Sequence, residues 1–346
     1  MCILRINIKE STMLILGIES SCDETGLALY SEDHGLIAHL VNSQIDLFTE
    51  YGGVIPEIAA RDHSAKIIGI LKQLLRQTNH KLNDIDLIAY TAGPGLIGSL
   101  MIGETVAKTI ANVLNIELLP INHLEGHILA PGLEEDGLEP PYLCLLVSGG
   151  HTQIIRCDGY GKYKIIGETI DDACGEAFDK VGKLLNLEYP GGPKVSQLAE
   201  NGDSQRFKFP RAMMKDKNLN FSFSGLKTAV LYALEDLNEG DHADVAASFQ
   251  EAVIDALTTK LTWAVQDTKI HKLVCSGGVA SNKLLRERLK QMAVNNNLEV
   301  SYPRMEFCTD NAAMIAYAGF IRKKFKLPTY STNYARPRWP LGELYD

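Results

Sequence analysis

Residues 13–30, MLILGIESSCDETGLALY, consist of two short apolar runs separated by a polar turn that contains Asp23, Glu24 and Gly26. Each run is long enough for a strand, and a glycine-bearing polar turn between two strands is typical of a β-hairpin. Residues 141–157, PYLCLLVSGGHTQIIRC, have the same arrangement around a glycine turn. Two halves that each open with strand, turn and strand predict a duplicated α/β architecture.

The rest of the chain alternates between helix-like and strand-like segments. Apolar residues at helical spacing predict helices at 64–79, 99–114, 168–185, 244–265 and 311–323. Compact apolar runs predict strands at 86–92, 116–121 and 272–276. Residues 189–228 are loop-rich and begin with the glycine–proline stretch YPGGPKV, which we interpret as a rigid loop. We expect the strands of both halves to end in polar or glycine-rich turns at one cleft.

The chain has 346 residues, a formal net charge of −9 and 45% hydrophobic residues, a composition typical of a globular protein with room for two domains. Its acidity argues against a protein that coats nucleic acid by bulk charge. The seven cysteines include no CxxC pair, which predicts reduced thiols and a cytoplasmic location. The apolar runs are too short to span a membrane, and the N-terminus does not resemble a signal peptide.

The first twelve residues, MCILRINIKEST, differ in character from the strand that begins at Met13. One hypothesis is that Met13 is the natural start, or that residues 1–12 form a loosely ordered extension. The alternative is an additional edge strand formed by the run ILRINI.

The stretch INHLEGHILAP at 121–131 places His123 and His127 four residues apart. On a helix capped by Asn122, the two imidazoles share one face and can bind one metal ion. Zinc proteases instead have glutamate directly after the first histidine, whereas Glu125 is displaced by one position, so a protease loses its general base. Two surface histidines remain the plain alternative. Asp310 is the best candidate for a third ligand, although it could simply cap the helix at 311–323.

Several turns carry groups suited to an anionic or metal-bound ligand. Asp23 and Glu24 could face a metal ion, or could form a solvated hairpin tip. Glycines in SGGHT, at 148–152, let main-chain amides approach anionic oxygens closely, and VCSGGVASN repeats the pattern. Asn282 at the start of a helix could bind an anion or only cap the helix, and Asp179 could be a solvated charge. Together these turns favour a nucleotide-sized ligand between two lobes.

Nine segments occur in the same order in the tRNA N6-adenosine threonylcarbamoyltransferase (TsaD) family, which this chain resembles from Met13 to its C-terminal RPRWPL. They are GIESSCDETG, TAGPGLIGSL, HLEGH, LLVSGGHT, DDACGEAFDKVGKLL, YPGGPKV, FSFSGLKT, CSGGVASNKLLR and CTDNAAMIAYAG. The resemblance implies the actin/sugar-kinase/Hsp70-type (ASKHA) fold, in which two RNase H-like lobes surround a nucleotide cleft. The N-terminal lobe would comprise residues 13–121 completed by 312–346, and the C-terminal lobe residues 122–311 with a helical and loop insertion at 189–228.

The resemblance also implies an activity, the transfer of a threonylcarbamoyl group from L-threonylcarbamoyl-AMP to N6 of adenosine 37 in tRNAs that read ANN codons. It implies one divalent ion, Fe2+ foremost with Zn2+ or Mg2+ as alternatives, bound by His123, His127 and Asp310. Adenylate-binding residues carried over by motif are Leu146, Val147, Ser148, Gly149, Gly150, Asp179, Gly192 and Asn282. Asp23 or Glu24 could orient or deprotonate the attacking amine.

Partners implied by the resemblance are tRNA, a TsaB-like paralogue and a TsaE-like ATPase, with a homodimer as a further expectation. Candidate tRNA contacts are Arg211, Lys215, Lys217, Arg322, Lys323, Lys324, Arg336 and Arg338. Two other classes remain open: a kinase-like or chaperone-like ATPase, which would not need the histidines, and a non-catalytic partner subunit, which would not be expected to keep them together with Asp310.

Overall fold

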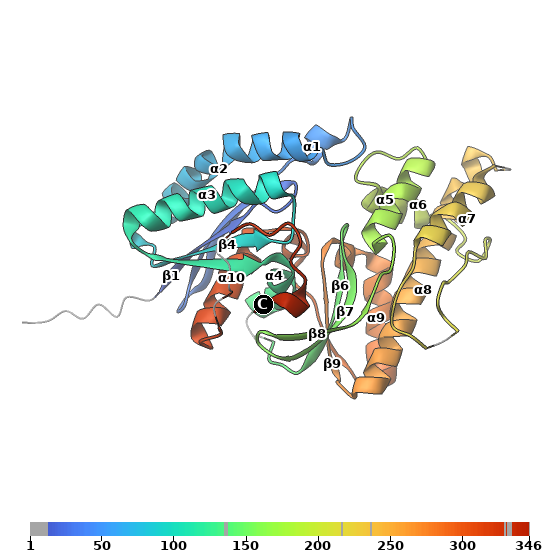
Figure 1. The fold of residues 1–346 in the computed structure, drawn as a ribbon. Coiled ribbons are helices and arrows are strands. Elements are labelled where there is room, and N and C mark those ends of the chain that lie inside the picture. The colour runs from blue at the N-terminus through green and yellow to red at the C-terminus, as the bar shows by residue number, and fades with distance from the viewer. Residues whose placement is uncertain are drawn as a thin grey trace, which may run out of the picture.

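The computed structural model describes residues 13–134, 138–215, 217–235, 237–328, 330 and 334–345. Two lobes, each built on its own five-stranded sheet, lie side by side with the C-terminal segment between them (Figure 1). The hypothesis about an extension or edge strand at 1–12 concerns residues outside this description.

The first sheet contains five strands in the order β3-β2-β1-β4-β5, and it forms around the stretch quoted above. The predicted hairpin is confirmed: β1 (Leu14–Glu19) pairs antiparallel with β2 (Glu24–Ser31), which pairs with β3 (Gly35–Ser43). On the other side of β1, the strands β4 (Leu87–Gly93) and β5 (Glu117–Asn122) run parallel to it.

The second sheet repeats this topology strand for strand. Its order is β8-β7-β6-β9-β10, in which β6 (Tyr142–Val147), β7 (Thr152–Gly159) and β8 (Lys162–Glu168) are antiparallel neighbours. The strands β9 (Lys272–Ser276) and β10 (Glu299–Ser301) continue parallel to β6. The predicted duplication is therefore present in the connectivity of the two sheets.

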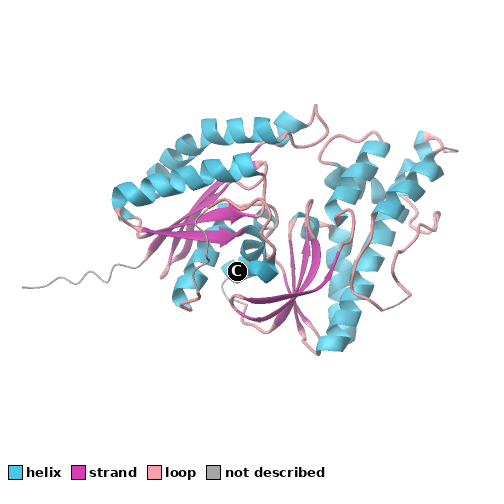
Figure 2. Ribbon diagram, viewed as in Figure 1, coloured by secondary structure: helices cyan, strands magenta, loops and turns pink. Residues whose placement is uncertain are grey.

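Helices cover both faces of the first sheet (Figure 2). In the first lobe, alternate side chains of β1 divide between two cores: Leu14, Leu16 and Ile18 belong to the core shared with α2 (Pro56–Thr78) and α3 (Ile97–Leu114), and Ile15 to the core shared with α10 (Ala312–Lys324). A Cβ at Gly17 would lie 2.4 Å from the Ala312 carbonyl oxygen, so glycine allows α10 to approach the sheet this closely. A short helix, α1 (Ile45–Phe48), precedes α2.

The second lobe packs its helices mainly on one side of the sheet, where they share one large apolar core. They are α5 (Cys174–Leu184), α6 (Gly191–Ala199), α7 (Ser224–Leu234), α8 (His242–Thr268) and α9 (Lys283–Asn296). The other face of this sheet, through Tyr142, Cys144 and Leu146, joins the core of the first lobe.

Two local predictions were wrong. The helix predicted at 168–185 begins only at Cys174: Ile170 is exposed, and Asp171 accepts hydrogen bonds from Ser222 and Ser224 instead of continuing a helix. The stretch predicted as a glycine–proline loop at 189–195 forms the first turns of α6 from Gly191 onward.

The sequence also led us to expect reduced cysteines, no membrane-spanning segment and defined lobe boundaries. The six cysteines among the described residues are free thiols, five of them buried. Of the helices described, none is both long and apolar enough to cross a membrane. The residue boundaries proposed for the lobes stay predictions, because α4 (His123–Leu129), which follows β5, packs against both α10 and β9.

Candidate metal centre

The predicted site residues gather where parallel strands end. Strands β1, β4 and β5 run in one direction, so their carboxyl ends at Glu19, Gly93 and Asn122 meet at one edge of the first sheet. In the second sheet β6 and β9 end at Val147 and Ser276 in the same way. Loops at the carboxyl ends of parallel strands are the usual location of ligand sites in α/β proteins.

The two histidines lie on α4, which starts directly after β5. The Asn122 side chain accepts hydrogen bonds from the amides of Leu124 and Glu125, which confirms the predicted cap. All seven residues of this helix are buried, which excludes the alternative of two surface histidines. The rings of His123 and His127 pack edge to face with centroids 4.7 Å apart.

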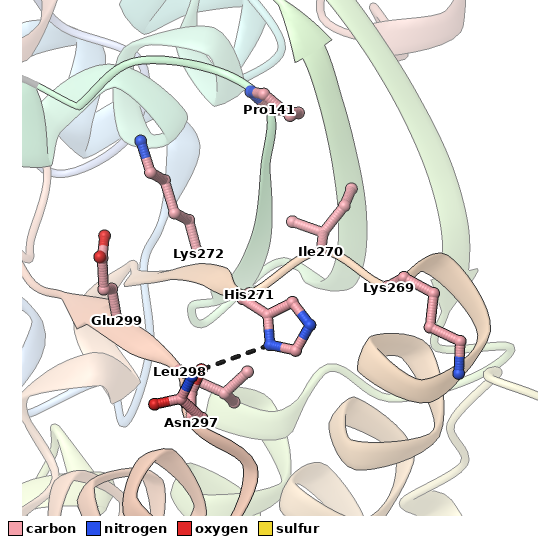
Figure 3. Close-up of a pocket in the computed structure, with 8 residues that line it drawn as sticks. All are labelled: Pro141, Lys269, Ile270, His271, Lys272, Asn297, Leu298 and Glu299. Carbon is pink, nitrogen blue, oxygen red and sulfur yellow. Dashed lines mark hydrogen bonds between the residues drawn. The ribbon is translucent and has the colours of Figure 1, made fainter.

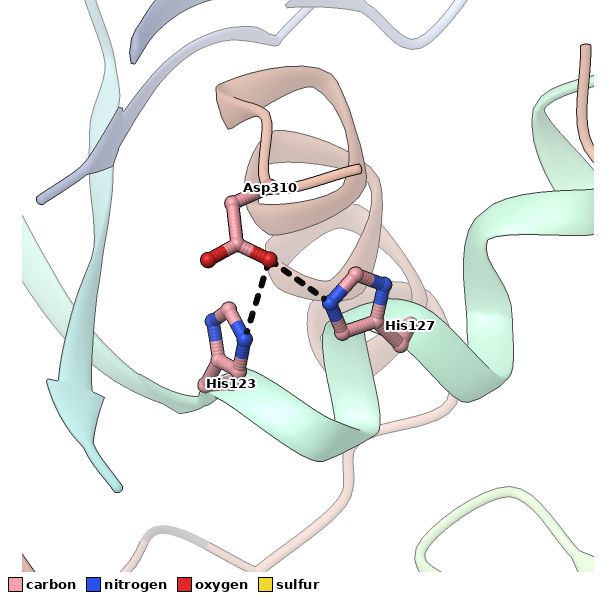
Figure 4. A group of neighbouring side chains, drawn as sticks. All are labelled: His123, His127 and Asp310. Atoms are coloured by element: carbon pink, nitrogen blue, oxygen red, sulfur yellow. Dashed lines mark hydrogen bonds and ion pairs between the residues drawn. The ribbon is translucent and has the colours of Figure 1, made fainter. Parts of the chain in front are cut away.

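Asp310 faces these two rings from the segment before α10 (Figure 4). Its Oδ1 lies 3.0 Å from Nε2 of His127 and 3.4 Å from Nε2 of His123. The alternative that Asp310 caps the following helix is excluded, because the side chain of Asn311 accepts the Met314 amide and serves as the cap. The carboxylate of Asp310 is therefore free to turn toward the histidines.

These three side chains could hold a metal ion. Two imidazole nitrogens and one carboxylate oxygen lie within 4.8 Å of one another. Divalent first-row ions bond such atoms at about 2.0–2.2 Å, so ligands at angles between 90° and tetrahedral lie roughly 3.0–3.4 Å apart. The observed separations of 3.0 and 3.4 Å from Oδ1 fall in this range. The donor set and the two separations from Asp310 therefore suit a bound cation.

Opposite charges alternate through the cluster. Burial by itself would lower the pKa of His123, but Asp310 and Glu19 on either side raise it well above its ordinary value. Burial would raise the pKa of Asp310, and the two histidines hold it below its usual range. A divalent ion in place of the Nε2 proton would keep positive charge beside these carboxylates.

His151, in the glycine turn after β6, adds a neutral imidazole to these surroundings. Burial, followed by the charges of His123 and His127, lowers its pKa to about 4. Its ring is therefore uncharged at neutral pH and adds no further positive charge to the cluster.

Glu125 lies on the opposite side of α4 from this cluster. Its carboxylate forms a buried ion pair with Arg322 of α10, with oxygen–nitrogen distances of 3.0 and 3.1 Å, and also accepts hydrogen bonds from Tyr163 and Tyr330. Glu125 therefore cannot act as the general base of a protease. The prediction that Arg322 contacts tRNA was wrong for the same reason, since its side chain is buried against Glu125.

The predicted adenylate-binding segment 146–150 follows β6 to the end of the sheet. The side chains of Leu146 and Val147 are fully buried, so only their main chain could reach a ligand. A Cβ built at Gly149 or Gly150 would meet no atom within 4 Å, so packing does not explain the glycines. Open space over a glycine turn is what close approach of a ligand requires.

The other predicted adenylate residues lie in the second lobe near this turn. Asp179 on α5 accepts the Gly192 amide at 3.1 Å, and burial raises its pKa, with a smaller contribution from Asp23 across the lobes. Asn282 caps α9 through its Oδ1 and donates from its NH2 group to Ser196 and Gln250, so both amide hydrogens are used within the protein. Contact of Asn282 with a ligand stays a prediction: its oxygen has a second lone pair for a ligand donor, whereas its NH2 group would have to break one of these bonds.

Asp23 lies in the turn between β1 and β2, close enough to Asp179 of the second lobe for its charge to raise the pKa of that residue, and Glu24 is the first residue of β2. Burial raises the pKa of Glu24 well above its ordinary value, and the charges of Asp310 and Asp23 raise it further. Their assignment as catalytic groups stays a prediction.

Two buried residues near the site were not identified from the sequence. Glu19 ends β1 and lies 3.2 Å from Nδ1 of His123, and His63 on α2 bonds to Thr25 and to the Cys22 carbonyl. A signal existed for Glu19, because a carboxylate inside the apolar run LILGIE needs a buried partner. No comparable signal marks His63 within the long amphipathic helix.

A cavity of about 410 Å³ lies elsewhere, at the opposite end of the second sheet (Figure 3). It is lined by residues that precede or begin β9 and β10, including His271, Lys272 and Glu299. Ser276, at the far end of β9, donates a hydrogen bond to the His127 carbonyl. Lys272 at the cavity and Ser276 beside α4 are four strand residues apart, which corresponds to about 13 Å, so this cavity is distinct from the metal centre.

Solved structures with similar folds include full-length HypF in a phosphate- and nucleotide-bound form, with 13% identity and a TM-score of 0.61 over 91% of this chain. The chain spans about half of that protein, 47%. The (R)-2-hydroxyglutaryl-CoA dehydratase component A of Acidaminococcus fermentans is 13% identical, with a TM-score of 0.51 over 88% of this chain and 96% of its own. Fold and site thus define a two-lobed protein of the predicted ASKHA type with a candidate metal centre between its lobes.

The family model for TsaD, tRNA N6-adenosine threonylcarbamoyltransferase, matches residues 35–317. A tRNA N6-adenosine threonylcarbamoyltransferase of Methylobacillus flagellatus is 51% identical over 336 residues, which cover 96% of this chain and 99% of that protein. The chain belongs to the tRNA N6-adenosine threonylcarbamoyltransferase family.

Proposed function

We propose that this chain transfers the threonylcarbamoyl group of L-threonylcarbamoyl-AMP to N6 of adenosine 37 in tRNAs that read ANN codons. The observation that carries the proposal is the convergence of His123, His127 and Asp310 at the strand ends of a chain in this family. A kinase-like ATPase would not need these ligands, and a non-catalytic subunit would not be expected to retain all three.

In this reaction the exocyclic amine attacks the carbamoyl carbon, the bond from that carbon to the phosphate oxygen breaks, and AMP leaves with the electron pair. The donor is already activated, so the protein chiefly has to align the reactants and stabilise negative charge. We assign AMP to the glycine turn at 148–150 with Asp179 and Gly192. We assign the amine proton to Asp23 or Glu24; burial raises the pKa of Glu24, and a carboxylate with a raised pKa, once ionised, is a better proton acceptor than an ordinary one.

Two imidazoles and one carboxylate form a donor set typical of non-haem Fe2+ and also compatible with Zn2+. Mg2+ prefers oxygen ligands, so we place it last. The bound ion would supply positive charge that polarises the carbamoyl carbonyl or holds the threonyl carboxylate. The chain's own contribution is to hold three ligand atoms in place and to leave the side toward Asp310, the most exposed of the three side chains, open to substrate.

Cytoplasmic location, action with a TsaB-like paralogue and a TsaE-like ATPase, and a homodimeric state are further parts of this proposal. The candidate tRNA contacts with exposed side chains are Lys215, Lys217, Lys323, Lys324 and Arg338. Three of the candidates are already in ion pairs and are therefore less available to bind phosphate groups: Arg211 with Asp255, Lys323 with Glu117, and Arg336 with Glu343.

A transfer assay tests the proposal. Purified protein is incubated with threonylcarbamoyl-AMP and unmodified tRNA, with and without the partner proteins, and digested tRNA is analysed for N6-threonylcarbamoyladenosine. We expect Asp310→Ala to reduce the rate about 10²- to 10³-fold with the fold retained, as for loss of one preorganised charge stabiliser. Asp158→Ala removes an exposed carboxylate and serves as the control. Wild-type transfer by Asp310→Ala would contradict the metal assignment, and no modified nucleoside in either arm would contradict the reaction.

A further inference from the structure

Glu19 is a fully buried carboxylate at the end of β1, surrounded by three hydrogen-bond donors. Its Oε1 accepts the Ser21 main-chain amide at 2.6 Å, and its Oε2 accepts the Thr91 hydroxyl at 2.6 Å. The same Oε2 lies 3.2 Å from Nδ1 of His123. A charge buried in a protein is expensive unless it is fully bonded, so this residue has a role beyond filling the core.

These contacts determine which nitrogen of His123 carries a proton. A carboxylate only accepts hydrogen bonds, so the nitrogen that faces Oε2 must donate. Nδ1 therefore keeps its hydrogen, for which the Ser21 hydroxyl at 3.2 Å is a second acceptor, and Nε2, which faces Asp310 at 3.4 Å, is the nitrogen left to bind an ion. His127 has no such partner, since its Nδ1 is buried without a hydrogen bond to any described residue.

We propose that Glu19 is a positioning residue that holds the Nδ1 proton of His123 and so directs Nε2 toward the metal ion. The inference rests on the metal centre of the proposed function. Partners of this kind orient the ring and increase the basicity of the liganding nitrogen. The orientations of the two rings then have different origins. Glu19 orients the ring of His123, whereas the ring of His127 is oriented by its position on α4 and by Asp310.

The surroundings of Glu19 make Glu19→Gln a sharp test. Because the Ser21 amide can only donate, a glutamine must place its oxygen there and its NH2 group where Oε2 was. That NH2 group would face Nδ1 of His123 and favour the form in which Nδ1 accepts, with the Ser21 hydroxyl left as the acceptor for any proton that stays on Nδ1. In the favoured form the imidazole proton lies on Nε2 and blocks the ion. Thr91→Val is the matched control, since it removes a hydrogen bond to the same Oε2 and leaves the charge in place.

The experiment measures Zn2+ affinity of the whole chain by competition with a chromophoric chelator. We expect Glu19→Gln to bind Zn2+ about 10- to 100-fold more weakly than wild type, with Thr91→Val within a few-fold of wild type. Equal affinities of Glu19→Gln and wild type would overturn the inference. If wild type binds Zn2+ no better than Asp310→Ala, the metal centre itself fails, and the two failures are thus distinct.

A second measurement needs no variant at the site. Nitrogen-15 NMR of histidine side chains in the zinc-loaded wild-type protein should show His123 with a proton on Nδ1 and zinc on Nε2. The Nδ1 proton should exchange slowly with water, because it is buried against Glu19. A His123 that binds zinc through Nδ1, or has no proton there, would refute the role of Glu19 even if Glu19→Gln does not fold.

Discussion

His63 is a buried imidazole whose two nitrogens are both bonded. Nε2 donates to the Cys22 carbonyl at 2.9 Å, so Nδ1 accepts from the Thr25 hydroxyl at 2.7 Å. Cys22 and Thr25 lie on either side of Asp23 and Glu24 in the chain. The two hydrogen bonds of His63 therefore attach this acidic segment to α2. Burial lowers its pKa, partly opposed by the Cys22 carbonyl and by nearby carboxylates.

This lowered pKa makes stability depend on pH with a definite sign. Above pH ~6.5 the imidazole is neutral in both states and contributes no pH dependence. As pH falls below that value, the unfolded chain takes up the proton first, and the free energy of unfolding falls by up to about 1.4 kcal/mol per pH unit until the folded pKa is reached.

The test compares wild type with His63→Gln, which keeps one donor and one acceptor but does not titrate. Urea denaturation between pH 7.5 and pH 5 should show wild type losing more unfolding free energy than the variant. His34→Gln, at an exposed position, controls for the loss of one imidazole. Curves for His63→Gln and wild type that stay parallel over this range would refute the prediction.

Single residues were predictable where chemistry is local and were missed where it depends on distant contacts. The spacing of His123 and His127 is visible within one helical turn. The roles of Glu19 and Arg322 depend on partners 104 and 197 positions away, which no local pattern contains. Asp310 was identified as the best third ligand, with helix capping as the alternative, and the neighbouring Asn311 is the cap, so one position decides whether a side chain serves the helix or the site.

The helices α4 and α10 together carry the metal centre, and a buried ion pair joins them. Glu125 on α4 and Arg322 on α10 are almost fully buried, and Tyr330 of the C-terminal segment bonds to both. Because the ligands lie on α4 and just before α10, this pair fixes how the helices sit relative to each other. Its loss should affect stability and metal binding together.

We expect Glu125→Ala to lower the free energy of unfolding by about 3–5 kcal/mol, because Arg322 is left buried without a counter-charge. The control is Glu57→Ala, which breaks an exposed pair with Arg61 and should cost 1 kcal/mol or less, about the value of a surface salt bridge. A double variant, Glu125→Leu with Arg322→Met, should recover part of the loss. Chemical denaturation measures all three, and equal effects of the two alanine variants would contradict the buried-pair argument.

Periodicity predicted α3 almost in full and α2 except for its first two turns from Pro56, and it failed where tertiary contacts override the apolar spacing. Residues 168–173 continue the apolar spacing of α5 but are not helical, because the Asp171 carboxylate accepts hydrogen bonds from the hydroxyls of Ser222 and Ser224. The glycines of α6 suggested a loop, but a Cβ at Gly191 would lie 2.9 Å from the backbone of Asp179. There glycine permits two helices to pack closely, and the proline lies in the first turn, where a helix tolerates it.

For the whole molecule, the repeated strand–turn–strand openings were enough to predict two related lobes. How the lobes are joined was not predictable, because part of the contact between them is made by the C-terminal segment, whose sequence shows no regular period. The Trp339 carbonyl accepts from Asn122 in the first lobe, and the Tyr345 hydroxyl donates to the Gly161 carbonyl in the second. Trp339, Leu341 and Leu344 are buried in the core that also contains residues of both sheets.

Because the C-terminal segment contacts both lobes, we expect the intact chain to unfold in one cooperative transition. We expect a chain that lacks Trp339 and the residues after it to unfold one lobe at a time. The chain has only two tryptophans, so Trp339→Phe leaves Trp263 on α8 as a fluorescent reporter of the second lobe. In Trp339→Phe, urea transitions followed by this fluorescence and by helical circular dichroism should coincide, as two-state unfolding requires. The chain that ends at residue 338 lacks the segment that covers the core of the first lobe, so the first lobe should unfold first. Its circular dichroism transition should therefore begin at a lower urea concentration than the transition followed by Trp263 fluorescence. Coincident transitions in the truncated chain would mean that the sheet contacts alone join the lobes.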